Sequence, residues 1–185
     1  MANVIVLHGT GGSPEDFWFP YLKNALELKG HKVWVPQLPD PEHPSVENWL
    51  PFVLNSGEIS AETVLVGHSA GCPLILSILE NISVKIAKAI LVAGFAYYLD
   101  PKVEDPIVQK SYNWHKIREH AKSIIMINSD NDPWGCNDKA GRYIFDNIGG
   151  TLIIRHGEGH MGSLSYNQPY REFPLLVDLI ESNGI

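Results

Sequence analysis

The sequence has few basic residues and almost no cysteine. Its 185 residues include 14 Lys and Arg against 21 Asp and Glu, which gives a net charge of −7 without any run of Lys or Arg. Proteins that bind a nucleic-acid backbone need a basic face, so we expect no nucleic-acid partner. The two cysteines, Cys72 and Cys136, lie far apart in the sequence and do not indicate a disulfide framework.

Long apolar runs and targeting segments are also missing. No stretch approaches the ~20 apolar residues that span a bilayer. The chain enters a β-rich run at Val4 without a charged, signal-like segment before it. We therefore expect a soluble, cytoplasmic protein with no membrane partner. The length and the 44% hydrophobic content suit one core, and no linker-like stretch is present, so we expect residues 1–185 to form one domain.

What the sequence does contain is a regular alternation of β-rich runs and helix-like segments. The runs that predict strands are residues 3–8, 32–36, 63–67, 87–93, 123–128 and 151–155. Apolar spacing and terminal signals predict helices at 17–29, 46–54, 70–80, 114–119, 137–147 and 170–182. This alternation predicts an α/β fold, a three-layer sandwich around a six-stranded parallel sheet. We expect the strand order 2-1-3-4-5-6, in which the third strand returns beside the first.

A G-x-S-x-G motif joins the third predicted strand to the helix that follows it. The motif is Gly67-His68-Ser69-Ala70-Gly71. A serine on a sharp strand-to-helix turn is exposed at the edge of the sheet, and small neighbours allow the strained backbone to form. We therefore predict that Ser69 is a nucleophile. The alternative is an inert serine on a glycine-rich turn.

Two aspartates compete for the acid of a catalytic triad. In this fold the triad order along the chain is Ser, then Asp or Glu, then His. The acid should follow the fifth predicted strand, where Asp130 and Asp132 both lie. Pro133 biases the backbone of Asp132 toward an extended conformation, which suits a side chain that projects from a loop. We favour Asp132, while either aspartate could instead accept hydrogen bonds within a turn.

Two histidines compete for the base in the same way. His156 and His160 both follow the sixth predicted strand. The glycine-rich loop around His160 suits a side chain that must reach Ser69, whereas His156 lies nearer the strand end and is interpreted as structural. Their spacing is superficially like that of H-E-x-x-H zinc helices. However, Glu158 is misplaced and the neighbouring glycines oppose a helix, so we predict no metal site.

The loop after the first predicted strand supplies candidates for an oxyanion hole. Residues 8–12 read His-Gly-Thr-Gly-Gly, and their glycines permit close approach of the backbone. We predict that the N–H groups of Thr10 and Ala70 are the two donors. The loop matches neither a phosphate-binding nor a dinucleotide-binding pattern, so we expect no cofactor. The predicted substrate contacts are Gly9, His68, Phe95 and Trp134, and Trp18 is a further aromatic candidate.

Together these motifs resemble the α/β-hydrolase superfamily. They are most similar to the small serine hydrolases of the retinoblastoma-binding protein nine family and their bacterial YdeN-like relatives. The resemblance spans nearly the whole chain and implies a reduced core with a Ser69, Asp132 and His160 triad. It also implies weak esterase activity on small activated esters. The animal relative binds retinoblastoma protein through an L-x-C-x-E motif, which this sequence lacks, so we do not expect that partner.

We therefore predict a serine hydrolase that cleaves small or activated carboxylic esters through an acyl-enzyme intermediate. A peptidase or amidase with the same triad is one alternative, and a protein-binding module with a vestigial triad is another. Residues 94–112 occupy the position of a cap in larger hydrolases but are few, which predicts a minimal cap and an open cleft. A large buried tunnel beside Ser69 would contradict this prediction.

Overall fold

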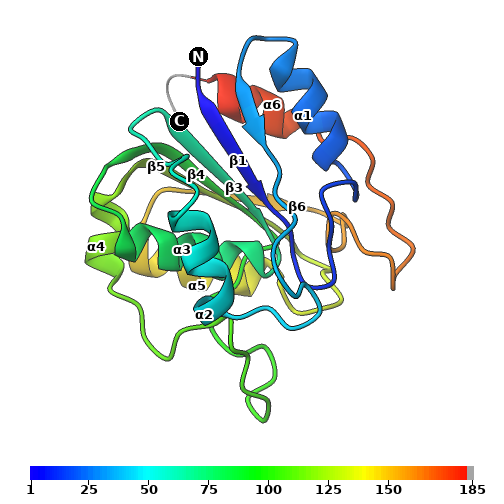
Figure 1. Cartoon of the computed structure of the whole chain (residues 1–185). Helices are drawn as coiled ribbons and strands as arrows, with labels where there is room; N and C mark the ends of the chain where they lie inside the picture. The colour runs from blue at the N-terminus through cyan, green and yellow to red at the C-terminus, as the bar shows by residue number, and fades with distance from the viewer. Residues whose placement is uncertain (183–185) are drawn as a thin grey trace.

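The computed structural model describes residues 1–182 and has a six-stranded parallel sheet at its centre (Figure 1). The strands are β1 (Asn3–Leu7), β2 (Lys32–Trp34), β3 (Thr63–His68), β4 (Ile86–Val92), β5 (Ala121–Ser129) and β6 (Thr151–Arg155). Their order is β2-β1-β3-β4-β5-β6, and every neighbouring pair is parallel. The predicted α/β class and strand order are confirmed.

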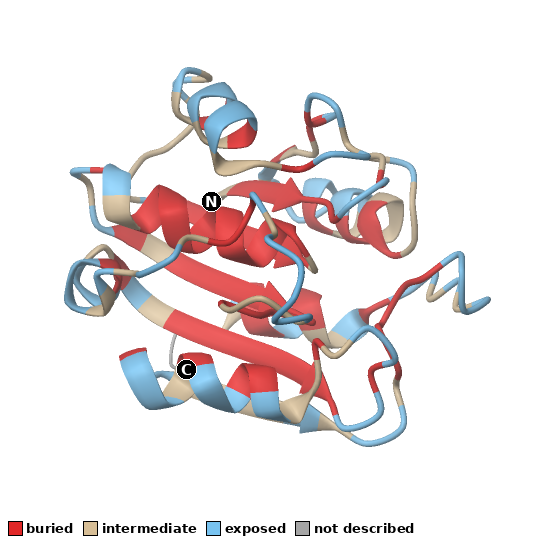
Figure 2. Ribbon diagram, turned by 90° about the horizontal axis from the view of Figure 1, so that it is seen from below, coloured by how far each residue is buried: buried red, intermediate tan, exposed pale blue. Residues whose placement is uncertain are grey.

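The central strands are buried on both faces. Side chains from Val4 to Leu7 in β1 and throughout β3 are inaccessible or nearly so. Figure 2 shows this as red strands between helices whose outer faces are exposed. A parallel strand covered on both sides needs apolar side chains at every position, which explains why these runs are continuous rather than alternating.

Six helices cover the sheet within the described residues. They are α1 (Phe19–Glu27), α2 (Val46–Leu54), α3 (Gly71–Asn81), α4 (Trp114–Glu119), α5 (Asp138–Ile148) and α6 (Pro174–Glu181). Helix α1 contacts α6, whereas α3 contacts α2 and α4 (Figure 1). Because α3 also packs on β3 and β4, it is buried from Gly71 to Leu79. The helix that follows the G-x-S-x-G motif is thus fixed by neighbours on several sides.

Several helices and strands begin or end at residues other than the predicted ones, and backbone constraints explain most of these differences. Helix α1 begins at Phe19 rather than at residue 17, because Phe17 has a left-handed φ of 49°. Helix α6 begins only at Pro174, and Tyr170, where we predicted its start, also has a positive φ. Strand β2 ends at Trp34, two residues before Pro36, which has no N–H for the ladder.

Strand β5 is longer than predicted at both ends. It pairs with β4 from Ala121 and with β6 as far as Ser129. Residues 94–112 contain neither helix nor strand, and the green loop between β4 and α4 projects from the molecule in Figure 1. The prediction of a minimal cap is confirmed. Among residues 1–182, no helix combines the length and apolarity needed to cross a membrane.

Candidate active site

Ser69 lies on the turn between β3 and α3 in a strained conformation. Its φ is 53°, in the left-handed region that costs a residue with a Cβ about 1–2 kcal/mol. The Ser69 N–H donates to the carbonyl of Val92 over 3.0 Å, and its own carbonyl accepts from the N–H of Cys72 over 2.9 Å. A Cβ at Gly71 would collide with the carbonyl oxygen of Leu7. The turn is therefore held by β4, by α3 and by the end of β1.

The two candidate acids and the two candidate bases form two separate pairs. His160 Nδ1 donates to Asp132 Oδ2 over 2.7 Å, and the two side chains are only 7% and 0% exposed. His156 Nδ1 contacts Asp130 Oδ2 at 2.5 Å, but the His156 side chain is 96% exposed. The structure thus places one pair in the interior beside the turn of Ser69 and the other on the surface.

The surface pair is an ordinary ion pair that also closes a loop. The N–H of Gly157 and the ring of His156 both donate to Asp130, and they lower the pKa of its carboxyl. The same contact raises the pKa of His156. An exposed pair of this kind contributes little to stability and lies outside the cleft described below. It fits the structural role that we predicted for His156.

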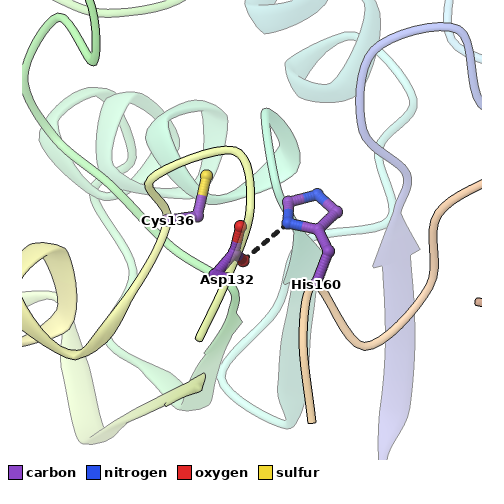
Figure 3. A group of neighbouring side chains, drawn as sticks. All are labelled: Asp132, Cys136 and His160. Atoms are coloured by element: carbon purple, nitrogen blue, oxygen red, sulfur yellow. Dashed lines mark hydrogen bonds and ion pairs between the residues drawn. The ribbon is translucent and has the colours of Figure 1, made fainter. Parts of the chain in front are cut away.

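The interior pair has a third neighbour, Cys136, whose side chain lies beside Asp132 and opposite His160 (Figure 3). Burial raises the pKa of the Cys136 thiol well above its usual range, and the nearby Ser69 side chain offsets this only in part. Cys136 also lines the same cleft as Ser69 and His160. Among residues 1–182, no hydrogen bond joins Ser69 Oγ to His160. Such bonds often tighten only when substrate is bound.

The donor atoms of Asp132, Cys136 and His160 lie within 4.8 Å of one another, a spacing that could hold a metal ion. Zinc is bound by thiolate and by neutral imidazole. The raised pKa of Cys136 opposes loss of its proton, and His160 Nδ1 already donates to Asp132. These features favour a hydrogen-bonded acid–base pair over a metal site, and the absence of a metal stays a prediction.

His68, the residue before Ser69, fixes the backbone of the candidate base. Its Nε2–H donates to the carbonyl oxygen of His160 over 2.9 Å, and the two rings are 4.9 Å apart. Burial is the main reason that the pKa of His68 falls to about 3, and the nearby His160 contributes further. His68 is therefore neutral. It borders the cleft, but its polar atom is bonded to the loop of His160, and its role as a substrate contact stays a prediction.

The neutral state of His68 predicts a pH-dependent stability. The folded pKa of about 3 lies below the ordinary 6.5, so the stability from His68 is complete above pH 6.5 and is lost as the pH falls toward 3. One such group gives a slope of up to about 1.4 kcal/mol per pH unit. The variant His68→Gln keeps an N–H donor and does not titrate. Urea unfolding between pH 7 and pH 4 should give this variant a shallower loss of stability, and equal slopes would contradict the prediction.

The loop after β1 approaches Ser69 closely and is held by His8. A Cβ on Gly9 would lie 2.8 Å from the Cβ of Ser69, so glycine is required for this approach. His8 Nε2 accepts from the N–H of Leu38 over 3.0 Å, so its Nδ1–H donates to the carbonyl of Gly9 over 2.8 Å. Burial lowers the pKa of His8, which favours this neutral form.

The two predicted oxyanion donors lie on the loop after β1 and at the start of α3. Thr10 lines the cleft, whereas Ala70 is buried at the N-terminal cap of α3. Among the residues that the structure describes, neither backbone N–H has a protein acceptor. Both N–H groups thus lack an acceptor among residues 1–182, and their role as an oxyanion hole remains our proposal.

Ser69 and His160 open into one cleft of about 980 Å³. All four predicted substrate contacts line it, namely Gly9, His68, Phe95 and Trp134. Trp134 is 48% exposed, so the cleft opens to solvent rather than forming a tunnel. Trp18 does not line it, because this side chain is fully buried and donates from its indole N–H to the carbonyl of Met161.

Sequence reasoning missed Cys136 and several other lining residues. Cys136 follows Asp132 by four residues within the loop after β5, and that proximity was the one available signal. Phe17 and Glu42 reach the cleft from the loops after β1 and β2. These loops meet at the carboxyl edge of the sheet, where ligand sites of parallel α/β folds are found.

Comparison with known proteins shows the family to which the chain belongs. The family model described as serine hydrolase matches residues 4–180. The chain belongs to the serine hydrolase family. This serine hydrolase is 36% identical to the Bacillus subtilis protein YdeN, over 97% of this chain and 95% of YdeN. It is 23% identical to the serine hydrolase RBBP9 of Rattus norvegicus, over 91% and 92% of the two chains.

Solved structures give the same result for the fold of this serine hydrolase. The crystal structure of YdeN superposes with a TM-score of 0.88 and 30% identity, and it covers 97% of both chains. The structure of Est1E from Butyrivibrio proteoclasticus with ferulic acid bound has a TM-score of 0.70 and 14% identity. It covers 98% of this chain and 87% of Est1E, and at that identity it shows the α/β-hydrolase fold alone.

Proposed function

We propose that this serine hydrolase cleaves small carboxylic esters through a triad of Ser69, His160 and Asp132. The observation that carries the proposal is the buried His160–Asp132 pair, whose His160 lines the same cleft as the strained Ser69. Proteins with the same fold include an esterase domain from a Rhodothermus marinus protein and a monoacylglycerol lipase from Paleococcus ferrophilus. Those proteins support ester chemistry here by analogy of fold.

In the proposed mechanism, His160 Nε2 takes the proton of Ser69 as Oγ attacks the ester carbonyl carbon. Asp132 accepts from Nδ1, orients the ring and stabilises the imidazolium that forms. The N–H groups of Thr10 and Ala70 would bind the oxyanion of the tetrahedral intermediate. The intermediate collapses, the alcohol leaves with the proton from His160, and the acyl group stays on Ser69. Water activated by His160 then releases the carboxylic acid.

Labelling with a fluorophosphonate probe tests the proposal directly. Such a probe phosphonylates an activated serine, so we expect the wild-type protein to be labelled and the variant Ser69→Ala to remain unlabelled. Ser13→Ala, which changes a serine before α1, is the matched control and should be labelled like wild type. Labelling that persists without Ser69 would contradict the proposal, because another residue would then be the reactive one. Absence of labelling from the wild-type protein would also contradict it and would favour a binding module. A panel of matched esters and amides then separates an esterase from an amidase or peptidase.

A further inference from the structure

The cleft beside Ser69 is acidic. Among residues 1–182, its lining includes five carboxylates and neither Lys nor Arg; the carboxylates are those of Asp16, Glu42, Asp100, Glu104 and Asp105. The histidines do not balance them: His68 is neutral, His160 is paired with Asp132, and the exposed His43 contacts Asp40. A charged substrate group that enters the cleft therefore meets a negative potential.

Two of these carboxylates accept a backbone N–H, and a third contacts a lysine. Asp16 accepts the N–H of Ser13 over 2.7 Å, and Asp100 accepts the N–H of Lys102 over 2.9 Å. Glu104 contacts Lys110 at 3.8 Å, but both side chains are about four-fifths exposed, with values of 79% and 82%. Water screens that pair strongly, so Lys110 neutralises Glu104 only weakly.

Like Asp16 and Asp100, the carboxylates of Glu42 and Asp105 lack a cationic partner within the described residues. A Glu42 oxygen lies 3.2 Å from the point that a Cβ on Gly11 would occupy, which places it against the loop of Thr10. Asp105 is partly buried and accepts only the N–H of Ile107, over 3.3 Å. Its burial raises the pKa of the carboxyl, and a nearby cation would favour the charged form. Each of the two thus provides a negative charge that is free to interact with a ligand.

Aromatic side chains line the same cleft as these carboxylates. Phe17, Phe19, Phe95 and Trp134 all contribute to the cleft. The face of an aromatic ring attracts cations as well as apolar groups. A cleft lined by both carboxylates and aromatic rings suits an alkylammonium group, which is both apolar and positively charged. The same surroundings disfavour an ester that carries a carboxylate.

We propose that the preferred substrates are small esters that carry an alkylammonium group, with Glu42 and Asp105 as the residues that select the charge. This inference rests on the proposed ester hydrolysis and names its substrate class. The cation gains from the negative potential in both encounter and binding, so the selectivity appears in kcat/KM. The expected advantage over a neutral ester of the same shape is about tenfold at low salt.

A pair of isosteric substrates measures this advantage. Butyrylcholine and 3,3-dimethylbutyl butyrate differ only in the replacement of a quaternary nitrogen by carbon. We expect kcat/KM to be about tenfold higher for the cationic ester, and the ratio to fall toward one in 0.5 M NaCl, where the Debye length is only about 4–5 Å. The double variant Glu42→Gln/Asp105→Asn should lower the ratio at low salt. The control Glu27→Gln/Glu62→Gln removes the same charge from exposed positions outside the cleft and should keep the wild-type ratio.

The outcomes separate the inference from the function on which it rests. Hydrolysis of both esters at equal kcat/KM, dependent on Ser69, would overturn the charge selectivity and leave the esterase proposal standing. A ratio that falls equally in both double variants would also overturn it, because the selectivity would then follow net charge rather than the cleft. Failure to hydrolyse either ester, together with loss of fluorophosphonate labelling, would overturn both proposals.

Discussion

The variant His160→Ala is expected to lower kcat for a small neutral ester by about a million-fold, the order seen when a triad histidine is removed from a serine hydrolase. His160 is buried against Asp132 and opens into the cleft of Ser69. Without the imidazole no group would remain to take the Ser69 proton, which leaves a weak nucleophile at neutral pH.

His156→Ala is the matched control for this experiment. His156 is four residues away, carries the same type of side chain and is also paired with an aspartate, but it lies on the surface. We expect kcat close to wild type for this variant. Both proteins should be compared by steady-state hydrolysis and by far-UV circular dichroism, which shows that they are folded. A larger loss in His156→Ala than in His160→Ala would reverse the assignment of the base.

The variant Asp132→Asn is expected to lower kcat by about ten-thousand-fold, the effect of the equivalent change in a well-studied serine protease. Asp132 accepts from Nδ1 of His160, which leaves Nε2 free to take a proton. An amide at this position donates as well as accepts, so it stabilises the tautomer with the proton on Nε2. That tautomer cannot act as a base toward Ser69.

Asp130→Asn provides the comparison, because Asp130 accepts from His156 and from the N–H of Gly157 outside the cleft. We expect little change in kcat for this variant. Because Asp130 is exposed, salt should weaken its ion pair with His156, whereas salt should not weaken the interior pair of Asp132 and His160. An equal loss of kcat in both aspartate variants would count against a distinct catalytic role for Asp132.

The sequence predicted the order of the sheet because its apolar runs leave few alternatives. Strands that are buried on both faces and separated by helices pair in parallel, and the G-x-S-x-G turn requires β3 to lie beside β1. The ends of elements were harder to predict. Phe17 and Tyr170 have positive φ values that no local pattern indicates, and they shorten α1 and α6 at their starts.

The triad order reduced the acid and base to two candidates each, and only local arguments and the family resemblance favoured Asp132 with His160. Asp130 and Asp132 are two residues apart, and His156 and His160 are four apart, so both members of each set lie on the same loop. Which aspartate meets which histidine depends on how the loops after β5 and β6 turn. The N–H of Gly159 donates to the side chain of Asn131, and this contact between the loops is a tertiary one.

The acidic lining of the cleft could not be predicted either. Glu42 comes from the loop after β2, and Asp105 from the irregular stretch between β4 and α4. In the sequence they are two of 21 acidic residues in a chain whose negative charge is consistent with solubility alone. Only the folded chain brings them to the same cleft as Ser69.

The hydrogen bond from His68 to the carbonyl of His160 joins two parts of the site that are 92 positions apart in the chain. Since His68 precedes Ser69 directly, the nucleophile and the base loop share one rigid connection through the interior. Their separation is then set by the scaffold before any substrate arrives. Larger hydrolases can use a closing lid to complete their sites, but an enzyme built in this way can dispense with one. Turnover in so small a protein would then be governed by chemistry or product release rather than by assembly of the site.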